Sequence, residues 1–142
     1  GTENIIGIVG LTKAMEVAYR DLAEHQNHIQ GIKTYMIELL EKTIPSVSFN
    51  GDPKGDSLYT VLNVTFPNSE MDEMLLYNFD IEGIAVSGGS ACSSGSNVGS
   101  HVLKSIGTDM TKPALRFSFS KYTTKKEIDY TIGVIKELFS IN

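Results

Sequence analysis

The one cysteine of the chain, Cys92, lies in a run of thirteen small or polar residues, 87–99. Within this run, Gly88, Gly89 and Gly95 permit backbone conformations that are closed to other residues. We therefore expect a flexible surface loop whose thiol is at least intermittently exposed, where thiolate character makes a cysteine reactive. Composition alone is equally compatible with Cys92 packing into the domain as a small hydrophobic residue.

Spacing separates the chemistries that a thiol in such a loop can perform. A cysteine-based phosphatase needs an arginine six residues beyond the nucleophile, and that position holds Val98. A papain-like pair needs a histidine base. His25 and His28 fall in a polar helical stretch, where we expect solvated side chains, and His101 falls near a helix start, where capping or packing is commoner. The phosphatase hypothesis fails, and the papain-like hypothesis has weak support.

Arg116 is the second residue of chemical interest, because it interrupts the apolar strand pattern Ala114–Phe119. An outward arginine on the solvated face of a strand is one interpretation. The other interpretation uses its planar guanidinium group, which binds a carboxylate through two parallel hydrogen bonds. Together with the cysteine loop, this arginine suggests thiol chemistry on an amino acid.

Hydrophobic periodicity predicts the elements that must position these residues. Apolar residues recur at helical spacing from Ile5 to Ile44, with a polar middle that predicts two helices or one bent helix breaking near Asp21 to Gln26. The remaining expected elements are a strand at Val47–Phe49, a strand at Leu58–Phe66, a helix capped by Ser69 and Asp72, a strand at Ile84–Val86, a helix from Ser100 ended by Gly107, the strand Ala114–Phe119, and a last helix with a Thr124–Glu127 capping box.

This order predicts an α+β fold over one domain, residues 1–142. We expect two layers, with a mostly antiparallel sheet of about three to four strands packed against helices and a long N-terminal helix or helix pair. Strands joined by helices are also compatible with parallel pairing in places, and the strand order is not readable from the sequence. The last helix should bury Ile128, Ile132, Ile135, Leu138 and Phe139.

Composition excludes several classes of protein. The 142 residues carry a net charge of −5 with a pI near 5.1, so we expect no nucleic-acid partner. No apolar run approaches the roughly 20 residues of a bilayer span, and no secretory leader is visible. A single cysteine forms no internal disulfide, and one cysteine with three histidines shows no zinc pattern, so we expect no metal and a cytoplasmic location. Because the first residue is Gly1, we expect a fragment or a processed chain.

Three ordered motifs resemble the C-terminal region of the NifS/IscS-type cysteine desulfurases. Residues 90–96 followed by 100–107 look like their active-site cysteine segment. Residues 114–120 with the following 123–129 resemble their substrate-arginine strand and last helix. The likeness begins at Gly1-Thr2-Glu3-Asn4 and spans essentially the whole chain in the right order.

This resemblance implies a pyridoxal-phosphate enzyme of the class V aminotransferase group. By the match, Cys92 attacks the sulfur of L-cysteine and keeps it as a persulfide, L-alanine leaves, and Arg116 binds the substrate α-carboxylate. Thr2 would reach the cofactor phosphate of the neighbouring subunit in a homodimer. The loop looks like the longer-loop branch associated with iron–sulfur cluster assembly, so a sulfur-acceptor or scaffold protein is an implied partner.

The family's Schiff-base lysine follows a histidine, and this chain contains no His-Lys pair. We therefore expect the chain to be a C-terminal small domain that is inactive when isolated. The alternative is a stand-alone sulfur-relay or interaction module that accepts a persulfide on Cys92 without pyridoxal-phosphate chemistry. A plain ligand-binding domain with an incidental thiol would require all three motif matches to be accidental.

Overall fold

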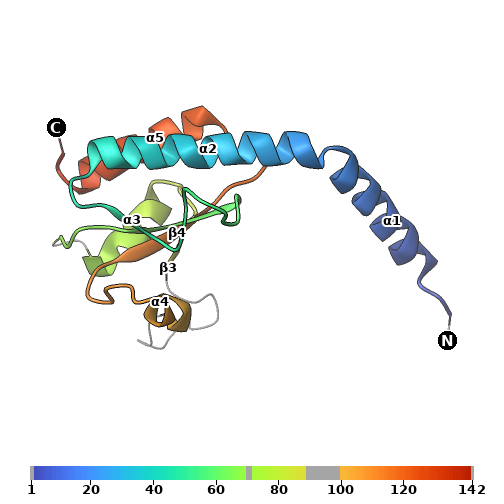
Figure 1. The fold of residues 1–142 in the computed structure, drawn as a ribbon, viewed down its shortest axis with the longest axis horizontal. Helices are drawn as coiled ribbons and strands as arrows, with labels where there is room; N and C mark the ends of the chain where they lie inside the picture. The colour runs from blue at the N-terminus through green and yellow to red at the C-terminus, as the bar shows by residue number, and fades with distance from the viewer. Residues whose placement is uncertain (1, 70–71, 89–99, 142) are drawn as a thin grey trace.

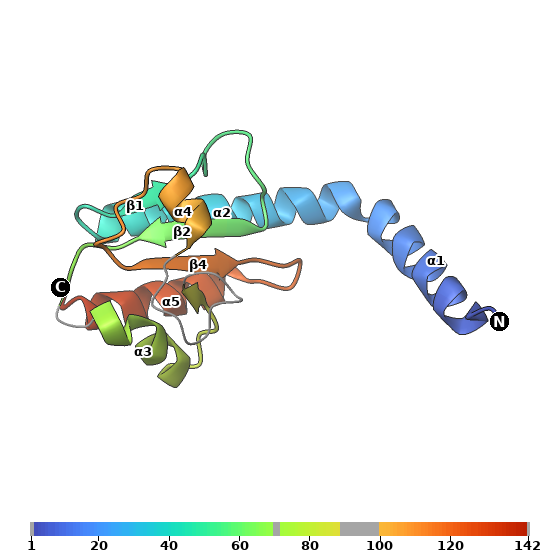
Figure 2. The same ribbon diagram turned by 90° about the horizontal axis from the view of Figure 1, so that it is seen from below.

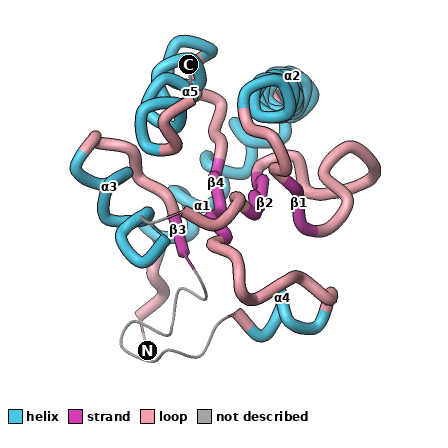
Figure 3. Tube along the Cα trace, turned by 90° about the vertical axis from the view of Figure 1, so that its left-hand side faces the viewer, coloured by secondary structure: helices cyan, strands magenta, loops and turns pink. Residues whose placement is uncertain are grey.

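Helices cover one face of a small antiparallel sheet in the computed structural model, which describes residues 2–69, 72–88 and 100–141. In chain order the elements are α1 (Ile5–Arg20), α2 (Leu22–Thr43), β1 (Ser48–Asn50), β2 (Val61–Thr65), the short 3-10 helix η1 (Asp72–Met74), α3 (Leu75–Ile81), β3 (Ser87–Gly88), α4 (His101–Ser105), β4 (Ala114–Ser118) and α5 (Lys125–Leu138). The strand order is β1-β2-β4-β3. In Figures 1 and 3, α2 and α5 lie together on one side of the sheet and α4 lies on the other. The predicted α+β class is confirmed.

The core lies between the sheet and the helix pair α2 and α5. Alternate side chains of β2 and β4 point toward these helices because successive residues of a strand face opposite sides. Leu62, Val64, Leu115 and Phe117 are therefore buried, at 5% exposure or less. Each fully buried side chain of this size contributes about 1.5–3 kcal/mol to folding. The helices contribute Ile29, Ile32, Met36, Ile37, Leu40, Ile128, Ile132 and Ile135 to the same cluster.

The N-terminal helical region bends where the polar middle predicts a break. Asp21 separates α1 from α2, and its carboxylate accepts hydrogen bonds from Nε and Nη2 of Arg20, both at 2.6 Å. Figure 2 shows α1 leading away from the sheet beyond this bend. No residue of α1 is buried, so its apolar side chains contribute nothing to the described core.

Three local helix signals hold, but the expected Ser69–Asp72 cap does not, because α3 begins after η1 and its N-terminus at Met74 has no side-chain cap among the described residues. Thr124 and Glu127 form the predicted capping box at the start of α5. The Ser100 hydroxyl caps α4 by accepting a hydrogen bond from the Leu103 backbone N–H. Gly107 follows α4 with a φ of 77°, a left-handed conformation that glycine adopts without strain.

Two strand predictions were wrong in position, and parallel pairing does not occur within the described sheet. The strand expected from Leu58 begins at Val61, because the chain turns at residues 58–61, where the Val61 N–H bonds to the Leu58 carbonyl. The strand expected at Ile84–Val86 lies instead at Ser87–Gly88. The Ile84 N–H bonds to the Phe79 carbonyl, so the start of this segment ends α3 instead of pairing with β4.

Candidate functional site

A row of four polar residues crosses the sheet on the face opposite α2 and α5. The strand registers pair Ser87 of β3 with Arg116 of β4, Arg116 with Asn63 of β2, and Asn63 with Asn50 of β1. We call these four residues the polar row. Since Leu115 and Phe117 point into the core, Arg116 between them points to the other face. The prediction left open whether this arginine faces open solvent, and the structure places it, half-buried, in this row.

The Arg116 guanidinium is only partly satisfied by the described protein. Its Nη2 donates a hydrogen bond to the Ser87 hydroxyl at 3.3 Å. Its Nε is buried and has no hydrogen-bond partner among the described residues. None of the ion pairs between described residues involves Arg116. The side chain therefore keeps donors with which it can bind a planar anion such as a carboxylate.

Asn50 connects the polar row to the segment after α4. Its Nδ2 donates to the Oδ1 of Asn63 at 2.6 Å and to the hydroxyl of Thr65 at 2.7 Å. Its Oδ1 accepts a hydrogen bond from the Thr108 hydroxyl at 2.9 Å. The residues that follow α4 are thereby tied to β1, and α4 lies on the polar face of the sheet (Figure 3).

The three predicted site residues are not all described. Cys92 lies outside the described residues, although Gly88 of β3, which pairs with Leu115, comes immediately before the undescribed segment 89–99. Thr2 is exposed and precedes α1, whose far end lies away from the sheet. The described structure therefore places Arg116 next to the strand that precedes the undescribed segment with Cys92, and it does not bring Thr2 to Arg116.

The three histidines all lie in helices, with His25 and His28 in α2 and His101 at the start of α4. His28 is exposed, as expected, yet its Nε2 lies 2.9 Å from the Thr123 carbonyl oxygen, which links α2 to the start of α5. His25 is half-buried, which differs from the expected solvated position. His101 is exposed as the first residue of α4, and its carbonyl oxygen accepts a hydrogen bond from the Ser105 hydroxyl.

Sequence reasoning missed Lys33, which is 1% exposed in the middle of α2. Its ammonium donates to the Ser57 hydroxyl at 2.9 Å and to the Leu58 carbonyl at 3.0 Å. Burial lowers the pKa of this amine, and the nearby Asp52 carboxylate partly opposes that shift. Lys33 anchors the loop before β2. Its helical spacing next to Ile32 could have suggested burial, but nothing local identified its partners.

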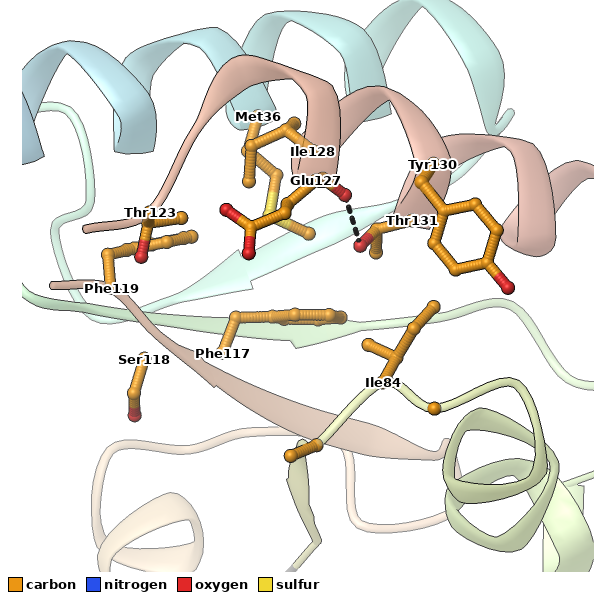
Figure 4. Close-up of a pocket in the computed structure, with 12 residues that line it drawn as sticks. Met36, Ile84, Phe117, Ser118, Phe119, Thr123, Glu127, Ile128, Tyr130 and Thr131 are labelled. Carbon is orange, nitrogen blue, oxygen red and sulfur yellow. Dashed lines mark hydrogen bonds between the residues drawn. The ribbon is translucent and has the colours of Figure 1, made fainter.

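A separate pocket of about 240 Å³ lies on the helix side of the sheet edge (Figure 4). Its floor is apolar, and the Ser118 side chain points away from it. At its rim the Tyr130 hydroxyl donates to the Glu82 backbone carbonyl at 3.1 Å. Burial and the Glu82 charge raise the pKa of Tyr130. Arg116 does not line this pocket, so we do not assign the amino-acid site to it.

Two further classes of site find no support in the part of the chain that the structure describes. There, no three histidine, cysteine, aspartate or glutamate residues come together as potential metal ligands. Within the same residues, no helix combines the length and the apolar character that crossing a bilayer requires.

The family model described as Aminotransferase class-V matches residues 1–131, so the chain belongs to the class-V aminotransferase family. Among curated relatives, the cysteine desulfurase IscS of Dictyoglomus turgidum is 37% identical over 140 residues, and that of Clostridium botulinum (strain Hall) is 39% identical over 140 residues. The alignments cover 97% and 96% of this chain but 35% of each relative. The chain thus spans about a third of the length of the relatives it matches.

Solved structures agree with this assignment. A NifS-like protein from Rickettsia africae superposes with a TM-score of 0.77 at 26% identity, and covers 99% of this chain and 36% of that one. A second NifS-like protein superposes with a TM-score of 0.75 at 30% identity, over 99% of this chain and 35% of that one. The resemblance inferred from the three sequence motifs is therefore confirmed at the level of the family and the fold.

Proposed function

We propose that residues 1–142 form the small domain of a cysteine desulfurase, an enzyme that converts L-cysteine to L-alanine and keeps the sulfur as a persulfide on Cys92. The observation that carries this proposal is Arg116, whose buried Nε lacks a partner among the described residues, on a strand paired with the one that immediately precedes the segment with Cys92. The cysteine desulfurases among the relatives support the choice of reaction.

Arg116 would bind the α-carboxylate of the amino acid. The N–H donors of its planar guanidinium group match the two oxygens of a carboxylate, and partial burial strengthens such a charge-assisted pair. Ser87 already accepts a hydrogen bond from Nη2 and so orients the guanidinium. The carboxylate would thereby be fixed on the polar face of the sheet.

Cys92 would then act as the nucleophile. Its thiolate attacks the sulfur of L-cysteine, a sulfur–sulfur bond forms, and the carbon–sulfur bond of the substrate breaks. The electron pair of that bond stays with the carbon fragment, which takes up a proton and leaves as L-alanine. The sulfur remains on Cys92 as a persulfide, from which an acceptor protein can take it.

Pyridoxal phosphate, when bound, supplies the electron withdrawal that activates the amino acid in such enzymes. The residues described here fit only part of a site for it. The one buried lysine, Lys33, is held by Ser57 and the Leu58 carbonyl beneath α2, and it is therefore not placed as an anchor. We assign Thr2 to the cofactor phosphate of a neighbouring subunit as part of the proposal.

The same proposal extends to the sulfur acceptor, the oligomeric state and the location of the protein. The IscS name of the relatives supports sulfur transfer to iron–sulfur cluster assembly, through an acceptor or scaffold protein. We further propose a homodimer in the cytoplasm, without a nucleic-acid or membrane partner. The net charge of −5 agrees with the absence of a nucleic-acid surface.

The test uses the longer protein that contains this chain and compares two competitive ligands. L-alanine carries the carboxylate, and L-alaninamide has the same amine and side chain without it. We expect Arg116→Gln to weaken L-alanine binding roughly a hundredfold and to leave L-alaninamide within about twofold.

Lys112→Gln is the matched control, because it removes one positive charge from an exposed side chain whose nearest carboxylate oxygen, on Asp109, lies 3.9 Å away. It should leave both ligands unchanged. Equal effects of Arg116→Gln on the two ligands, or no effect on either, would overturn the assignment of Arg116 and with it the proposed function.

A further inference from the structure

Asn63 lies opposite Arg116 in the sheet. The hydrogen-bond pattern between their strands makes this the closer of the two kinds of cross-strand pair. The Phe119 N–H bonds to the Thr60 carbonyl, and the Phe66 N–H bonds to the Pro113 carbonyl. In an antiparallel ladder, hydrogen-bonded and non-hydrogen-bonded pairs alternate, so Asn63 and Arg116 form a non-hydrogen-bonded pair. Such pairs bring the two Cα atoms to about 4.5 Å and their side chains closest together.

The side-chain amide of Asn63 is held in one orientation. Its Oδ1 accepts the 2.6 Å hydrogen bond from Nδ2 of Asn50. Asn50 is fixed in turn, because its amide also bonds to the hydroxyls of Thr65 and Thr108. The carbonyl end of Asn63 is thus occupied, and its Nδ2 makes no hydrogen bond to a described residue. An oriented donor beside a guanidinium with an unpartnered Nε is suited to a carboxylate.

We propose that Asn63 is a second binding residue for the α-carboxylate, donating from Nδ2 to the anion that Arg116 binds, and that Asn50 is the positioning residue that orients it. This inference rests on the proposed function and adds a residue to it. Two strands then supply donors to one carboxylate, and Thr108 connects this arrangement to the segment after α4.

Substitution of Asn63 by aspartate distinguishes a carboxylate-binding role of this residue from a purely structural role. Aspartate keeps the oxygen that accepts the Asn50 hydrogen bond, so a purely structural role for Asn63 would be preserved. It removes the donor and places a negative charge beside Arg116, which would compete with the ligand carboxylate. We therefore expect Asn63→Asp to weaken L-alanine roughly tenfold to a hundredfold, and to leave L-alaninamide within about twofold.

Two more variants and one control variant complete the comparison in the longer protein. Asn63→Ala removes the donor without adding charge and should weaken L-alanine about tenfold, again without an effect on L-alaninamide. Asn50→Ala should give a smaller loss with the same selectivity for the carboxylate. Asn68→Asp, at an exposed position outside the polar row, is the control for the added charge and should change neither ligand.

The outcomes separate this inference from the proposed function. If Arg116→Gln discriminates between the two ligands and the Asn63 variants do not, the role of Asn63 is wrong and the proposed function stands. If the Asn63 variants weaken both ligands equally, Asn63 is structural and the inference is overturned. If Arg116→Gln also fails to discriminate, the proposed function fails as well.

Discussion

At the scale of single residues, Arg116 combines a structural cost with the binding role that we propose for it. A buried N–H without a partner costs about 1–3 kcal/mol, and Nε of Arg116 is in that position among the described residues. A carboxylate that pairs with the guanidinium would remove this cost on binding. In the proposed site, this gain would favour the ligand-bound state over the ligand-free state.

Glu127 gives a prediction of pH dependence. Hydrogen bonds from the backbone N–H and the hydroxyl of Thr124 lower the pKa of its carboxyl below the ordinary value of 4.5. A lowered pKa in the folded state contributes stability that is complete above pH 4.5 and is lost as the pH falls through the folded-state pKa. We expect wild type to be more stable than Glu127→Gln at neutral pH, with a difference that shrinks as the pH falls below 4.5.

Urea unfolding at a series of pH values measures this difference. Glu38→Gln is the control, because the exposed Glu38 carboxylate makes no hydrogen bond to a described residue. A difference between wild type and Glu127→Gln that stays constant across the acidic range would contradict the assigned role of the capping box.

The residues predicted correctly are those whose signal is local. The Thr124–Glu127 box and Gly107 depend on neighbours a few positions away in sequence, and both hold in the structure. Lys33 and Asn63 depend on partners brought together by the sheet and the loop, so no local pattern could assign their roles. Cys92 lies outside the described residues, and its role stays a prediction.

At the scale of elements, α1 differs from the other long helices of the described chain, α2 and α5, because it has no buried residue. We expect deletion of residues 1–20 to change the free energy of unfolding by no more than about 0.5 kcal/mol, because surface changes away from the core have small effects. Leu40→Ala, at a fully buried position, should instead cost about 2–5 kcal/mol. Urea unfolding measures both, and a loss on deletion as large as that of Leu40→Ala would contradict this view of α1.

The hydrophobic period predicted the type of each element, but it did not predict the exact bounds of the strands or how they pair. The bend at Asp21 and the strand β4 were predicted because their patterns are contained within the segments themselves. β3 was misplaced because the Ile84 N–H ends α3 through a bond to the Phe79 carbonyl. The insertion of β4 between β2 and β3 is a non-local choice that brings Asn63 opposite Arg116, and periodicity carries no information about it.

At the scale of the whole molecule, the chain matches about a third of the length of its desulfurase relatives. The described residues supply donors for a carboxylate, and their buried lysine is committed to Ser57 and Leu58. We therefore expect the chain by itself to release no sulfide from L-cysteine when pyridoxal phosphate is added. Sulfide and L-alanine formed together by the isolated chain would contradict this expectation.

The most direct test of the account is the mass of the peptide that contains Cys92, after the longer protein has reacted with L-cysteine. We expect that peptide to become heavier by one sulfur atom, with L-alanine formed in equal amount in the first turnover, and we expect Cys92→Ser to abolish both changes. The central claim is that this thiol receives the sulfur. It would be contradicted if Cys92→Ser formed L-alanine at the wild-type rate and the wild-type peptide gained no sulfur.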